Sequence, residues 1–117
     1  MKKIIYYQKE NGDIPMENFL DVLFSKNRIL ATKTVAKIMS LSFGKLGAKD
    51  VKYIWNDLYE LRIRERNNIS RVFYFIHVWN AYVILDWIIK KDQKLKHQDI
   101  KRNVTYKNDY KKRFGIL

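Results

Sequence analysis

The 117-residue sequence has no cysteine, one proline, four glycines and no long hydrophobic run. Without cysteine there can be no disulfide framework, no cysteine nucleophile and no thiolate ligands for zinc or iron–sulfur clusters. The scarcity of proline and glycine leaves no linker, so we predict a single domain over residues 1–117. The apolar runs are far shorter than the roughly 20 residues of a membrane-spanning helix, and no signal peptide is visible. We therefore expect a cytoplasmic protein without a membrane partner.

Histidine is scarce as well. The chain has only His77 and His97, and no His-x-x-x-His spacing occurs. Two isolated histidines cannot by themselves supply the three or four protein ligands of a typical zinc site. We expect His77, in an apolar segment, to be a core or sheet-face residue, and we expect the protein to use no metal or other cofactor.

Acidic residues are also few compared with basic ones. There are 24 lysines and arginines against 12 aspartates and glutamates, which gives a net charge of +12 and a pI near 9.9. Such an excess favours polyanionic partners such as RNA or DNA. The excess is greatest near the C-terminus, where ten basic and three acidic residues follow Ile89. Charge alone also fits a well-solvated surface, so it does not define a function.

Hydrophobic periodicity predicts an α+β fold with helices first and most of the strands after them. Met16, Phe19, Leu20 and Leu23 form one apolar stripe behind Pro15, which suits the first turn of a helix. We expect an N-terminal strand and a two-helix hairpin packed on a small antiparallel sheet, and a basic C-terminal helix lying loosely at the sheet edge. The expected elements are a strand at 2–8, a helix from Pro15, a helix at 28–46, strands at 58–64, 71–79 and 82–89, and a helix after Gln98.

Charged side chains gather on the predicted sheet. Glu60, Arg62 and Arg64 alternate with apolar residues and share one strand face. Arg71 begins the next expected strand after a short turn, and Lys90-Lys91 closes the third. Fixed cations of this kind stabilise the negative charge that develops on a phosphate during transfer, and the arginine fork matches phosphate geometry. An ordinary solvated sheet face would show the same alternation.

Three segments, in this order, give the chain a resemblance to a known family. Leu58–Arg62 resembles the Leu-Tyr-Glu-Leu-Arg signature of phage-derived HigB-like toxins, which are RelE/HigB-type toxins of type II toxin–antitoxin systems. Arg71–Tyr74 resembles the Arg-Val-aromatic-Tyr strand of that family, and Lys90–Lys94 resembles its Lys-Lys-Thr-Gln-Lys run. The chain departs from the family where Asp86-Trp87-Ile88 replaces a His-Gly-Phe-like triplet, Lys96 replaces a proline and Asp99 replaces a glutamate.

The resemblance implies a RelE-like fold and a metal-independent endoribonuclease that cuts messenger RNA, usually in the decoding site of the ribosome, and so inhibits translation. It implies phosphate stabilisation by Arg62 and Arg71, with Lys90 and Lys91 as substrate clamps or transition-state partners. Glu60 is a candidate general base by position, and an ion pair with Arg71 on the surface is the alternative interpretation. The implied protein partner is a helix-turn-helix antitoxin from an adjacent gene, and operator DNA is contacted only through that antitoxin.

Basic residues around and beyond the last strand are the expected RNA contacts. His97 would suit acid catalysis near neutral pH, although a solvated loop histidine is the plainer interpretation. The expected RNA-binding residues are Arg64, Lys94, Lys96, His97, Lys101 and Arg102.

Three alternatives stay open. A ParE-like toxin keeps the fold but poisons DNA gyrase without cutting RNA, and it would not need the arginine and lysine set. A non-catalytic nucleic-acid-binding module would use the basic tail, but Phe73, Tyr74 and Phe75 are expected in a buried strand rather than on a stacking platform. A metal-dependent nuclease is disfavoured because the Glu-Leu-Arg segment lacks the lysine of common nuclease motifs. Its candidate ligands would be Asp57, Glu60 and Asp86.

Overall fold

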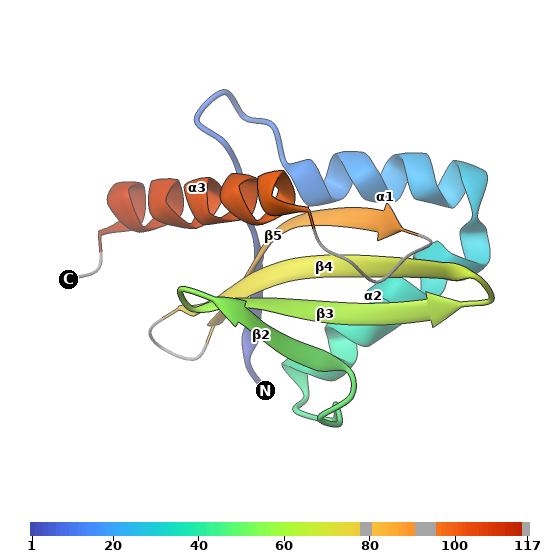
Figure 1. The fold of residues 1–117 in the computed structure, drawn as a ribbon. Coiled ribbons are helices and arrows are strands. Elements are labelled where there is room, and N and C mark those ends of the chain that lie inside the picture. Colours follow the sequence, from blue (N-terminus) through green and yellow to red (C-terminus); the bar gives the residue numbers. More distant parts are fainter. Residues whose placement is uncertain (78–80, 91–95, 116–117) are drawn as a thin grey trace.

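The protein has an α+β fold, as the sequence predicts (Figure 1). A computed structural model describes residues 1–77, 81–90 and 96–115, with only the backbone of Lys90. In chain order the elements are β1 (Lys3–Tyr6), α1 (Pro15–Lys26), α2 (Arg28–Ser42), β2 (Val51–Trp55), β3 (Leu58–Glu65), β4 (Asn68–His77), β5 (Ala81–Lys90) and α3 (His97–Phe114).

The strands form one sheet in the order β1-β5-β4-β3-β2. Strands β2 to β5 pair antiparallel with their neighbours, so the predicted meander of β3, β4 and β5 is present. β1 adds a parallel edge strand next to β5. The prediction missed β2, because Lys52, Tyr53 and Trp55 are exposed and the segment has no apolar alternation to reveal it.

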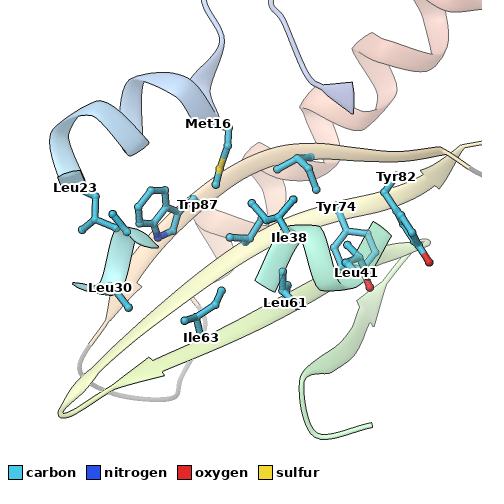
Figure 2. Close-up of a cluster of buried hydrophobic side chains, with 13 residues drawn as sticks. Met16, Leu23, Leu30, Ile38, Leu41, Leu61, Ile63, Tyr74, Tyr82 and Trp87 are labelled. Carbon is cyan, nitrogen blue, oxygen red and sulfur yellow. The ribbon is translucent and has the colours of Figure 1, made fainter. Parts of the chain in front are cut away.

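The hairpin of α1 and α2 covers one face of the sheet. Asn27 separates the two helices: its backbone N–H caps α1 at the Leu23 carbonyl, and its side chain accepts a hydrogen bond from the Leu30 N–H at 3.2 Å. Apolar side chains of both helices then pack on Leu61 and Trp87 of the sheet (Figure 2). Burying this cluster supplies the hydrophobic stabilisation of the hairpin.

Helix α3 packs on the opposite face, so the prediction that it lies loosely at the sheet edge is wrong. Tyr110 joins a buried cluster with Phe73, Phe75 and Leu85 of the sheet. The buried Tyr7 hydroxyl also donates to Asp109 of α3 at 2.6 Å. The apolar stripe of α3 is thin in the sequence because aromatic rings and these polar links supply much of its packing.

Candidate active site

The strand register sets the two predicted phosphate-binding arginines side by side. Arg62 of β3 is directly opposite Arg71 of β4, and Arg71 is opposite Ile88 of β5. Because side chains alternate along a strand, Glu60 and Arg62 lie on the α3-facing side of the sheet together with Leu58. Glu60, Arg62 and Arg71 therefore come together from two neighbouring strands, β3 and β4.

Glu60 joins these arginines into one ion cluster. Its Oε1 accepts a short hydrogen bond from the Arg62 Nε, and its Oε2 lies 3.6 Å from the Arg71 Nη1. The Glu60 and Arg71 side chains are both 0% exposed, whereas that of Arg62 is 19% exposed. Within this cluster, Arg62 is thus the residue that reaches the surface.

The burial of Arg71 and Glu60 corrects two expectations. Arg71 does not begin a strand at the solvent, because β4 starts at Asn68 and pairing with β3 already begins at Glu65. The tight turn, with Arg66 at a φ of 55°, places Arg71 inside the ladder between β3 and β5. The pairing of Glu60 with Arg71 is present, but it is a buried ion pair and not a surface one.

A cationic pocket opens next to this cluster. Its volume is about 500 Å³, and its lining residues are Lys37, Lys49, Asp50, Arg62 and Arg64. The pocket lies where β2 begins, since Val51 pairs with Leu61 and the Asp50 carbonyl accepts from the Arg62 N–H at 3.0 Å. Four cationic residues and one carboxylate line the pocket, and this excess of positive charge favours the binding of an anion.

The single carboxylate is already neutralised. Lys37 Nζ lies 2.8 Å from an oxygen of Asp50. The hydrogen bond from Lys37, with one from the Gly47 N–H, lowers the pKa of Asp50. The sequence did not identify Lys37 or Lys49 as site residues. They come from α2 and the following loop, and only the packing of α2 on β3 brings them to Arg62.

Arg102, an expected RNA contact, is held by two carboxylates. Its Nε donates to Asp86 at 2.6 Å, and its Nη2 donates to Asp99 at 3.3 Å. Burial raises the pKa of Asp86, against the opposing effects of the Trp87 N–H and of Arg102. These bonds fasten the start of α3 to β5, so Arg102 is a structural link whose charge is largely offset.

The other expected contacts are dispersed. Arg64, Lys96, His97 and Lys101 are exposed, and His97 and Lys101 line a separate pocket beside β2. Lys90 ends β5 opposite Ile69. Lys91 and Lys94 lie outside the described residues.

The described ranges offer neither a cluster of metal-ligating side chains nor a membrane-spanning helix. No group of three or more histidine, aspartate or glutamate side chains there could hold a metal ion. None of the helices described is long and apolar enough to cross a membrane.

Comparison with known families identifies the class of protein. The phage-derived Gp49-like family (DUF891) matches residues 19–106, from within α1 to the middle of α3. The chain therefore belongs to this family, which is a toxin-like one. A search of curated proteins gave no match. The matched region contains the Glu60–Arg62–Arg71 cluster and the whole cationic pocket.

Proposed function

We propose that the chain is an RNA-cutting toxin of the RelE/HigB type, the toxin half of a toxin–antitoxin pair. The observation that carries this proposal is the position of Arg62: its Nε donates to the buried Glu60, and the residue also lines the cationic pocket. A preorganised cation at the edge of a pocket lined by further cations suits phosphoryl transfer. Membership of a toxin-like family supports the same function.

In the proposed reaction a ribose 2′-oxygen forms a bond to the neighbouring phosphorus, and the bond to the leaving 5′-oxygen breaks. The 2′-hydroxyl proton passes to a base and an acid protonates the 5′-oxygen, so the products are a 2′,3′-cyclic phosphate and a 5′-hydroxyl. No metal is needed. Arg62 stabilises the charge that develops on the phosphate oxygens.

The geometry divides the roles of the other residues. Glu60 and Arg71 are buried, so we assign them to positioning Arg62 rather than to substrate contact or base catalysis. Arg64, Lys37 and Lys49 bind phosphates of the same strand next to the reacting one. Lys90 and Lys91 keep their proposed roles as substrate clamps. In the proposed system the substrate is messenger RNA on the ribosome, and a helix-turn-helix antitoxin neutralises the toxin.

The proposal is tested by expressing three proteins in bacteria: the native chain, Arg62→Ala and Lys112→Ala. The Lys112→Ala variant is the control, because it removes an exposed charge far along α3. Native chain and the control should stop protein synthesis, and the RNA cut in these cells should carry 2′,3′-cyclic phosphate ends. Arg62→Ala should cut roughly 100-fold more slowly, the cost of losing one preorganised donor. Products with 5′-phosphates, or full activity of Arg62→Ala, would refute the mechanism. Continued translation with arrested DNA replication would favour a gyrase poison.

A further inference from the structure

A second pocket lies between β2 and the first half of α3. It has a volume of about 440 Å³ and is lined by Ile54, Trp55, His97, Ile100, Lys101 and Val104. Ile54, Ile100 and Val104 also pack against the α3-side core, so they form a built apolar floor. His97 and Lys101 are exposed polar residues at the same pocket. None of these residues belongs to the Glu60–Arg62–Arg71 cluster.

Trp55 is the unusual residue of this pocket, because its large indole side chain is 61% exposed. The backbone fixes it there. Trp55 pairs with Leu58 after a register irregularity, and the intervening Asn56 and Asp57 have φ values of 52° and 61°. The buried Lys107 of α3 donates from its Nζ to the Asn56 carbonyl. The turn that carries Trp55 is thereby tied to the helix that forms the other wall of the pocket.

We propose that this pocket binds one unpaired nucleotide of the RNA substrate, with its base stacked on Trp55 and its phosphate next to Lys101. The proposal rests on the proposed function. An exposed indole beside a cation is the combination that single-stranded nucleic acids bind, because every base offers a π face and every linkage a negative charge. The net charge of +12 favours a nucleic acid over an apolar peptide as the occupant.

The location of the pocket suits the same RNA strand that is cut. Trp55 pairs with Leu58, which lies on the same strand and the same sheet face as Glu60 and Arg62. Leu58 is four residues from Arg62, or about 13 Å at the usual strand rise. A nucleotide on Trp55 would therefore be near the cut site but not at it. Its binding would fix the register of the RNA without taking part in the reaction.

The test uses two labelled oligonucleotides that cannot be cut because they lack the 2′-hydroxyl: an octamer of deoxythymidine and an octamer of abasic deoxyribose with the same phosphates. Their Kd values are measured by fluorescence anisotropy at several salt concentrations. We compare the native chain with Trp55→Ala and Trp55→Phe. Phe43→Ala, which removes an exposed aromatic ring at the end of α2, is the matched control.

Native chain should bind the thymidine octamer roughly tenfold more tightly than the abasic one, the scale of one stacked base. Trp55→Ala should lose this preference without a change in salt slope, Trp55→Phe should keep most of it, and Phe43→Ala should keep all of it. Lys101→Ala should instead reduce the salt slope by about 0.7, the value for one phosphate of a single strand.

Equal binding of the two octamers by native chain would overturn the proposal, and so would an unchanged preference in Trp55→Ala. Weaker antitoxin binding by Trp55→Ala, with oligonucleotide binding intact, would also overturn it and would assign the pocket to a protein partner. The native comparison needs no variant to fold. Failure here is distinct from failure of the proposed function, because RNA cleavage by native chain and by Arg62→Ala is measured separately.

Discussion

Replacing Arg71 by alanine should destabilise the fold strongly. Its side chain is fully buried and its Nη1 lies 3.6 Å from the equally buried carboxylate of Glu60. Breaking a buried ion pair costs about 3–5 kcal/mol. Because Arg62 still contacts Glu60 in this variant, we expect a loss at the lower end of that range, about 3 kcal/mol. For a domain of this size that corresponds to a fall in Tm of roughly 12 °C, at about 4 °C per kcal/mol. Arg62→Ala removes a partner that is 19% exposed and leaves Arg71 on Glu60, so it should cost less than Arg71→Ala.

Thermal and urea denaturation followed by circular dichroism would measure both variants. A third variant, Glu60→Leu/Arg71→Leu, leaves neither member of the pair charged and should be more stable than Arg71→Ala. If the Tm of Arg71→Ala is lower than that of native chain by less than about 4 °C, the arginine is not in a buried ion pair. A double variant less stable than Arg71→Ala would contradict the desolvation cost on which the magnitude depends.

Two further predictions concern the links between α3 and the rest of the protein. Asp86 has a raised pKa in the folded state, so its ionised form is disfavoured by folding and this cost grows as pH rises from about 4. In urea titrations the stability of native chain relative to Asp86→Asn should therefore fall as pH rises from about 4 to about 7; a difference that stays constant or changes in the other direction would contradict this. Tyr7→Phe removes a hydrogen bond that lowers the pKa of Asp109, so about 1 kcal/mol should be lost at pH 7. Because the lowered pKa stabilises the fold only while Asp109 is ionised, the difference from native chain should shrink as pH falls below 4, and the same titrations would refute this if the gap stayed constant.

The sequence predicted the parts of the fold that have a periodic apolar signal. The apolar stripe of α1 predicts a helix, and the aromatic run of β4 predicts a strand. β2 does not, because an edge strand with an exposed Lys52 shows no alternation. The face taken by α3 could not be predicted either, since three of its four buried residues are polar ones, such as Lys107, which a sequence pattern assigns to solvent.

The candidate site was predictable only in part for a related reason. Arg62 and Arg71 could be placed on adjacent strands from the short turn between them, and the register does bring them together. Whether each arginine faces water depends on what covers the sheet, which alternation does not reveal. Lys37 and Lys49 are distant in sequence from Arg62, and neither differs locally from any other surface lysine.

The parallel pairing of β1 with β5 has a consequence for how the protein is made. Lys3 lies opposite Ala81, so the first strand finds its only described neighbour in the sheet near the end of the chain. The helix hairpin and the β3–β4 hairpin can form from nearby residues, whereas β1 has to wait for β5 to be synthesised. Closing so long a loop carries an entropic cost before any contact offsets it. A chain that stops before β5 therefore leaves β1 without its partner strand.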